Sequence, residues 1–193
     1  MNIPLFLMNI FTPNTLKKEK LRELFNVTAE AFQIPPPTLS NLKFNELLHA
    51  FAEFTLDAAI RQMSKNEDIS QVKRRLYDGA FRIGKNIRSE LRIHSLKDAL
   101  KSAGLLYRAI GIDFHCDESG QVAIRRCYFS SFYSCEVCWI ISSLDEGLIA
   151  GLTDGGRLWF VSRITEGSDS CVGTIEFETS TVPTPERRET TFN

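Results

Sequence analysis

The chain of 193 residues has no excess of positive charge and no long apolar run. Its 23 Lys and Arg residues are balanced by 24 Asp and Glu residues, which gives a formal net charge of -1. Proteins that bind nucleic acid usually carry a basic excess or a basic stripe, so we expect no nucleic-acid partner. A membrane-spanning helix needs about 20 apolar residues. The apolar segment at residues 3–11 is shorter and contains Pro4 and Asn9, so we also expect no membrane span.

A complete disulfide framework is excluded by the odd number of cysteines, which is five. The opening residues also lack the charged segment and the cleavage site of a secretory signal peptide. Disulfides persist mainly in oxidising compartments, so we expect a cytoplasmic protein with free thiols. Free cysteine is among the most buried residue types. Each thiol is therefore a candidate either for chemistry or for simple packing.

The domain organisation follows from a hydrophobic content of 43%, which suits one globular domain with a sizeable core. We expect an N-terminal arm at residues 1–13, a single domain at 14–178 and a flexible tail at 179–193. The domain divides into a helical half at 14–111 and a sheet half at 112–178. The fold class expected from this order is α/β in the broad sense, and more narrowly α+β, with N-terminal helices packed on a C-terminal antiparallel sheet.

Apolar residues at helical spacing predict four helices in the first half of the domain. The fourth begins at Ser95, which together with Asp98 resembles a capping box. Gly79 and Gly84 lie inside the third helix, at a cost of roughly 1 kcal/mol each relative to alanine. Small residues at these positions let either a neighbouring helix or a ligand approach closely, and we favour a helix.

The pattern changes from helical to extended after Gly111. Residues 112–117 and 121–127 form a predicted hairpin, and residues 134–148 a predicted helix capped by Ser134. Two further strands are expected, one at 157–165 and one from Cys171 to Phe177.

Strand alternation turns Cys171 and Gly173 inward on the last predicted strand. A glycine beside a thiol suits either the floor of a pocket or a β-bulge. A pocket here would lie between the third helix and the sheet face that carries Phe160, Cys171 and Gly173. Tyr107 or Arg163 would supply its polar contact.

The spacing Cys135-x-x-Cys138 supports two further hypotheses. With Ser134 as the helix cap, the helix dipole is expected to lower the pKa of Cys135 in particular. The pair is also half of a zinc site, which Cys127 and Cys171, or His115, would complete. A structural zinc site usually has two such pairs, and the second is missing here.

Short spaced motifs cover somewhat over half of the chain, from the third predicted helix onward. They are Ala80-Phe81-Arg82-Ile83-Gly84, Leu106-Tyr107-Arg108-Ala109-Ile110-Gly111-Ile112, Arg126-Cys127, Glu136-Val137-Cys138, Glu146-Gly147-Leu148-Ile149-Ala150-Gly151-Leu152 and Glu166-Gly167-Ser168-Asp169-Ser170-Cys171. The set resembles the 4-vinyl reductase domain and the related L-2-amino-thiazoline-4-carboxylic acid hydrolase family. The resemblance implies the fold of the ligand-binding domains of nitric-oxide signalling and Golgi transport proteins. It also implies a homodimer that holds a small apolar or planar molecule.

The resemblance implies that Cys127, Cys138 and Cys171 are the family's motif cysteines, and that Gly167 and Asp169 belong to the turn before the last strand. Residues Val172-Gly173 depart from the pattern, because an aromatic or acidic residue is expected soon after the cysteine.

Three functions remain open at this point. In the first, a cysteine thiolate attacks a C=N or acyl carbon of a small thiazoline-type heterocycle, and Asp145, His115 or Asp169 serves the proton transfer. In the second, the domain binds a small ligand without turnover. In the third, Cys127, Cys138 and Cys171 hold zinc.

Overall fold

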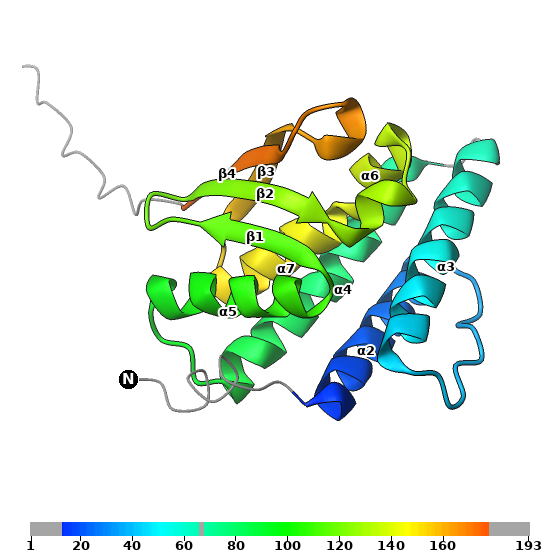
Figure 1. Cartoon of the computed structure of the whole chain (residues 1–193), viewed down its shortest axis with the longest axis horizontal. Helices are drawn as coiled ribbons and strands as arrows, with labels where there is room; N and C mark the ends of the chain where they lie inside the picture. The colour runs from blue at the N-terminus through cyan, green and yellow to red at the C-terminus, as the bar shows by residue number, and fades with distance from the viewer. Residues whose placement is uncertain (1–12, 66–67, 178–193) are drawn as a thin grey trace, which may run out of the picture.

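Four long helices form the first half of the computed structural model, which describes residues 13–65 and 68–177 (Figure 1). They are α2 (Asn14–Phe32), α3 (Phe44–Ser64), α4 (Ile69–Glu90) and α5 (Leu96–Ala109). The four predicted helices are thus confirmed. The predicted arm, apart from residue 13, and the predicted tail lie outside the described residues.

Side-chain caps define where two of these helices begin. Asp68 accepts a hydrogen bond from the backbone N–H of Ser70 and starts α4, with an N···O distance of 2.9 Å. Ser95 accepts one from the backbone N–H of Asp98 at 3.1 Å and starts α5. Such caps satisfy backbone donors that have no partner in the first helical turn. The cap predicted at Ser95 is therefore confirmed.

A four-stranded antiparallel sheet forms much of the second half. Its strands are β1 (Ile112–Cys116), β2 (Gln121–Cys127), β3 (Arg157–Ser162) and β4 (Cys171–Glu176). The order in the sheet is β1-β2-β4-β3, so the last strand lies between β2 and β3. The α+β class and the predicted hairpin are confirmed.

The third strand is shorter than predicted. It ends at Ser162, after a register shift between Phe160 and Ser162, and the 3₁₀ helix η2 (Ile164–Glu166) replaces its predicted last residues. This short helix brings Ile164 and Thr165 to the place where β4 begins.

The prediction of one continuous helix after Ser134 was wrong. The structure has two helices, α6 (Cys135–Ile141) and α7 (Ser143–Thr153), and they meet at Ser142. The Ser142 hydroxyl donates to the carbonyl of Trp139 at 3.1 Å, and such local bonds compete with regular helix geometry. The 3₁₀ helix η1 (Tyr128–Ser131), which precedes α6, was not predicted.

Glycines let α7 pack directly against the backbone of α4. A Cβ atom added at Gly147 would meet the carbonyl oxygen of Tyr77, and one added at Gly151 would meet that of Phe81. A Cβ at Gly84 would likewise meet the carbonyl of Leu148. A Cβ at Gly79 would meet the side chain of Val27 in α2. The expectation that a helix contacts the small residues of α4 is therefore confirmed at both Gly79 and Gly84.

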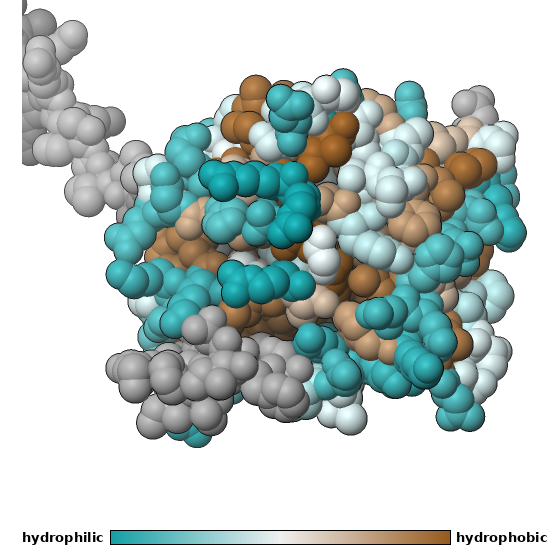
Figure 2. Space-filling view, viewed as in Figure 1, coloured by the Kyte–Doolittle hydropathy of each residue, from teal (hydrophilic) through white to brown (hydrophobic). Residues whose placement is uncertain are grey.

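The surface in Figure 2 shows hydrophobic residues scattered between hydrophilic ones on this side of the molecule. Among the helices of the described residues, none combines the length and the apolar character needed to cross a bilayer.

Candidate functional site

A cavity of about 100 Å³ lies between the helices and the ends of the strands, and three of the five cysteines line it. Cys127 is the last residue of β2, Cys138 lies in α6 and Cys171 is the first residue of β4. Asp145 of α7 and Tyr107 of α5 line the same cavity. The other lining residues are mostly apolar: Leu24, Phe51, Ile110, Ile112, Phe129, Ser130, Tyr133, Ile141, Ser142, Leu144, Leu148, Ile164 and Thr165. Residues that are far apart in sequence thus form one site, which we call the cysteine cavity.

Asp145 is the titratable group best suited to proton transfer in this cavity. Burial raises its pKa from 3.8 to about 7, an effect that Glu146 increases and that Tyr107 and Arg163 oppose. The Asp145 charge also raises the pKa of each cysteine that lines the cavity. A carboxyl group with a pKa near neutral pH can both accept and release a proton under physiological conditions.

The cysteines of the cavity are neutral thiols at neutral pH. Burial raises the pKa of Cys127 to about 12, although the backbone N–H groups of Phe129 and Ser130 oppose this rise. Burial also raises the pKa values of Cys138 and Cys171. The sulfur of Cys171 accepts a hydrogen bond from the backbone N–H of Ile164 at 3.4 Å. A thiolate in this cavity therefore requires a base that removes the proton.

Buried polar atoms without a hydrogen-bond partner surround the cavity. They include the Tyr107 hydroxyl, the Thr165 hydroxyl and Nε of Arg163. The Tyr107 side chain is only 2% exposed. Its hydroxyl lowers the pKa of Asp145, but the contact falls short of a complete hydrogen bond. Because a buried unpaired polar group costs about 1 to 3 kcal/mol, these atoms indicate a site that a ligand or water completes.

Replacing Tyr107 with phenylalanine tests this interpretation. Since no complete hydrogen bond is lost, we expect Tyr107→Phe to leave the free energy of unfolding unchanged or to raise it by up to about 1 kcal/mol. The pKa of Asp145 should rise further, because the hydroxyl that lowers it is gone. Urea unfolding and a carboxyl titration by NMR measure the two effects. A loss of 2 kcal/mol or more would show that the hydroxyl is already satisfied.

Two predicted catalytic residues lie away from the cavity. His115 is exposed on β1, and its Nε2 lies 3.1 Å from Oδ1 of Asp113. Asp169 is exposed in the turn before β4. Neither lines the cavity, which corrects the expectation that they serve its chemistry. The alternation of β1 gives the reason, because Phe114 is buried and its neighbour His115 must face the other way.

Of the predicted ligand contacts, two lie at or near the cavity and two lie away from it. Tyr107 lines the cavity, and Arg163 lies close enough to lower the pKa of Asp145. Phe160 and Gly173 pair with each other across β3 and β4 and do not line the cavity. A Cβ atom at Gly173 would meet the carbonyl oxygen of Trp159. This glycine therefore serves close strand packing, which corrects its expected place in a pocket floor.

Cys135 is not the activated thiol that the helix dipole predicts. Desolvation raises its pKa, and the carboxylates of Glu166 and Glu136 raise it further. Cys135 also lies outside the cysteine cavity. Desolvation, followed by the nearby carboxylates, thus raises the pKa of Cys135, whereas a lowered pKa was expected.

The cysteines of the cavity do not fit a zinc site. Within residues 13–65 and 68–177, no group of three or more His, Cys, Asp or Glu side chains is arranged to hold a metal ion. A structural zinc site needs four such ligands in a tetrahedron. We therefore assign no metal-dependent step to this cavity.

Four polar residues that line the site were missed by sequence reasoning, namely Ser130, Tyr133, Ser142 and Thr165. The Tyr133 hydroxyl forms a buried hydrogen bond with Thr55 of α3, which joins the cavity wall to the helical half. Thr165 lies in η2, which was predicted as strand. The run of aromatic residues after Cys127 was the available signal for Tyr133, because it favours a packed turn over an exposed loop.

No protein-family model matches the chain, and no curated protein matches it either. The resemblance to the 4-vinyl reductase domain and to the thiazoline-carboxylate hydrolases therefore stays a prediction. The function has to be inferred from the cavity itself.

Proposed function

We propose that this protein binds a small, mostly apolar molecule in the cysteine cavity. The observation that carries the proposal is the combination of apolar walls with a few inward polar groups, namely Asp145, Tyr107 and Thr165. Ligand sites in proteins typically have this composition. Neutral thiols suit such a role, because they line an apolar wall without the cost of a buried charge.

A second candidate is thiol-dependent hydrolysis of a small thiazoline-type heterocycle, and the pKa of Asp145 favours it. The Asp145 carboxylate would take the proton of a cysteine thiol, and the sulfur would form a bond to the carbon of the C=N group. The π electron pair of the C=N group would move to nitrogen, which takes the proton from Asp145. The ring C–S bond would then break, and the C=N bond re-forms as the ring sulfur leaves as a thiol with the proton from nitrogen. Water would add to the resulting thioimidate carbon and displace the cysteine sulfur, which regains its proton as the carbonyl forms.

Serine substitutions of single cysteines separate the two functions. We expect Cys127→Ser, Cys138→Ser and Cys171→Ser each to change the melting-temperature shift that a bound heterocycle causes, because all three line the cavity. Cys116→Ser is the matched control, since Cys116 lies on β1 outside the cavity and its thiol contacts the carbonyl of Asp117 at 3.4 Å. Thermal shift with a panel of small heterocycles measures binding, and release of a new thiol from a thiazoline carboxylate measures hydrolysis.

Hydrolysis predicts that one of these substitutions lowers turnover by a factor of about 1,000 or more, as expected when a nucleophile is removed. Binding alone predicts no turnover by any variant and ligand-dependent protection of the thiols from alkylation. If the ligands that stabilise the protein leave the alkylation of Cys127, Cys138 and Cys171 unchanged, the cysteine cavity is not the binding site.

A further inference from the structure

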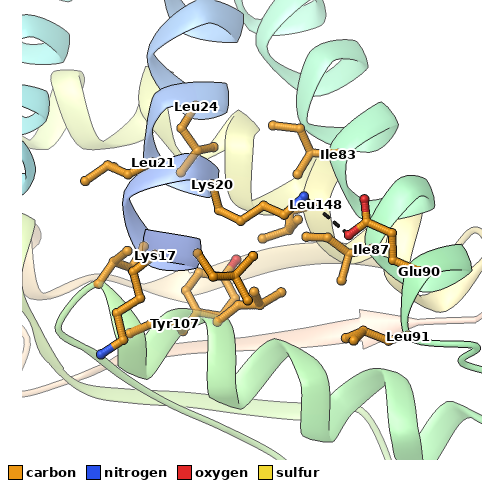
Figure 3. Close-up of a pocket in the computed structure, with 14 residues that line it drawn as sticks. Lys17, Lys20, Leu21, Leu24, Ile83, Ile87, Glu90, Leu91, Tyr107 and Leu148 are labelled. Atoms are coloured by element: carbon orange, nitrogen blue, oxygen red, sulfur yellow. Dashed lines mark ion pairs between the residues drawn. The ribbon is translucent and has the colours of Figure 1, made fainter. Parts of the chain in front are cut away.

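A second apolar space adjoins the cysteine cavity and extends to the first turns of α2 (Figure 3). We call it the apolar chamber, and its volume is about 110 Å³. Helices α2, α4, α5 and α7 form its walls, with Lys20 of α2 extending toward Ile87 of α4. Among the described residues that line it, the charged ones are Lys17, Lys20 and Glu90. The chamber therefore suits the apolar part of a molecule.

The chamber and the cysteine cavity have part of their walls in common. Leu24, Tyr107, Ile110 and Leu148 line both spaces. The buried Tyr107 hydroxyl without a complete hydrogen bond belongs to this shared wall. A ligand longer than the cysteine cavity can therefore extend along these residues into the chamber.

The lysines at the outer end of the chamber differ in their partners. Lys20 forms ion pairs with Glu23 at 3.1 Å and with Glu90 at 3.4 Å, and Figure 3 shows the latter pair. Lys17 has no carboxylate partner among the described residues and lies over the ring of Phe44, with 5.7 Å to its centroid. The charge of Lys17 is therefore available to a ligand, whereas that of Lys20 is already compensated.

Lys17 and Ala109 also line an open groove on the surface, with a volume of about 780 Å³. We call it the basic groove, because Lys18, Lys43 and Arg108 line it as well. Its described lining contains no Asp or Glu, and none of its cations forms an ion pair within residues 13–65 and 68–177. Positive charge without an internal partner attracts an anionic group.

We infer that the ligand is an elongated apolar molecule that carries one anionic group, such as a carboxylate. Its apolar body occupies the apolar chamber and reaches the cysteine cavity, and its anionic group lies in the basic groove. The inference rests on the proposed binding function and adds the class of the ligand. Its physical basis is that three spaces adjoin one another. A basic groove whose cations have no ion-pair partner among the described residues shares lining residues with the apolar chamber, and the chamber shares lining residues with the cysteine cavity and its inward polar groups.

Calorimetry on the full chain tests the anionic group with decanoate, decanol and acetate as probes. Decanoate should bind about fivefold more tightly than decanol at low salt, since one exposed ion pair contributes up to about this factor. Acetate should not bind measurably, because it has no apolar body. Added salt should weaken the binding of decanoate and leave that of decanol unchanged.

Charge reversal in the basic groove provides the matched comparison. We expect Lys43→Glu combined with Arg108→Glu to weaken decanoate binding by about tenfold and to leave decanol binding unchanged. Lys101→Glu is the control, because Lys101 is exposed on the same helix as Arg108 but lies outside the groove. Equal binding of decanoate and decanol, or an unchanged affinity of the double variant for decanoate, overturns the assignment of an anionic group.

Ala109 tests the path between the groove and the chamber, because it lines both and is only partly buried. Ala109→Phe should abolish decanoate binding and leave the binding of a compact heterocycle in the cysteine cavity intact. Decanoate should also slow the alkylation of the cavity thiols. If a heterocycle protects these thiols and decanoate does not, the inferred ligand class is wrong and the proposed function stands. If no probe protects them, the proposed function itself fails.

Discussion

Replacing Gly151 with alanine is expected to destabilise the protein by about 2 to 4 kcal/mol. A Cβ atom at this position would meet three backbone groups of α4, namely the carbonyl oxygen of Phe81, the nitrogen of Lys85 at 2.8 Å and the Cα of Gly84 at 2.9 Å. Backbone atoms of a helix cannot rotate away as a flexible side chain can. Helices α4 and α7 would have to separate, and overpacking of this kind typically costs 1 to 3 kcal/mol or more.

The matched control is Gly104→Ala in α5, for which the opposite sign is expected. The nearest atom to a Cβ at Gly104 is the carbonyl oxygen of Phe114 at 3.7 Å, which is an ordinary contact. Alanine is favoured over glycine inside a helix by about 1 kcal/mol, so Gly104→Ala should stabilise the protein by about that amount. Urea unfolding of both variants gives the two free energies. A stable Gly151→Ala variant would show that α7 does not pack on α4 as the structure has it.

These glycines illustrate how much of the fold the sequence could predict. Gly84 was recognised as a place of close helix approach, since a small residue inside an apolar face has few other uses. Its partner could not be identified, because Gly147 and Gly151 are separated from it by the whole β-hairpin. Local patterns indicate which surface of a helix packs closely. They do not indicate which distant segment packs there.

In the candidate site, too, local patterns do not indicate which distant residues come together. The three cysteines named from the resemblance line one cavity, but the residues chosen to assist them do not lie together. Asp145 lies inside and His115 outside. The position of His115 was within reach of strand alternation from Phe114. The environment of Asp145 was not, because its pKa depends on burial by several elements at once.

Replacing Asp145 with asparagine is expected to make the protein more stable above pH 7, and to have little effect below pH 4. The pKa of Asp145 is raised in the folded protein, from 3.8 to about 7. A raised pKa means that the folded state holds the proton more tightly than the unfolded state. Protonated Asp145 therefore makes its full contribution to the free energy of unfolding below about pH 4, and this contribution is lost as the pH rises to 7. Asparagine resembles the protonated acid but has no proton to release, so the variant keeps this contribution at high pH.

The full shift corresponds to a free energy on the order of 4 kcal/mol above pH 7, which is an upper bound for the gain of Asp145→Asn. Urea unfolding at several pH values from 4 to 9 measures the difference between the variant and the wild type. Only the difference is informative, because other carboxylates with lowered pKa values, such as Asp117 and Asp154, titrate in both proteins. Asp169→Asn is the control, since Asp169 is exposed outside the cavity, and it should give no such pH-dependent difference.

The same variant distinguishes the two proposed functions of the cavity. If Asp145 removes a proton from a thiol during hydrolysis, Asp145→Asn should lose turnover while it gains stability, because an amide cannot act as a base. If the cavity only binds an apolar ligand, the variant should keep its affinity for a neutral compound. A partly buried acid that costs stability at neutral pH is commonly found where function requires it. An Asp145→Asn variant with no gain above pH 7 would mean that the carboxyl group is solvated, and would remove this argument for a role in proton transfer.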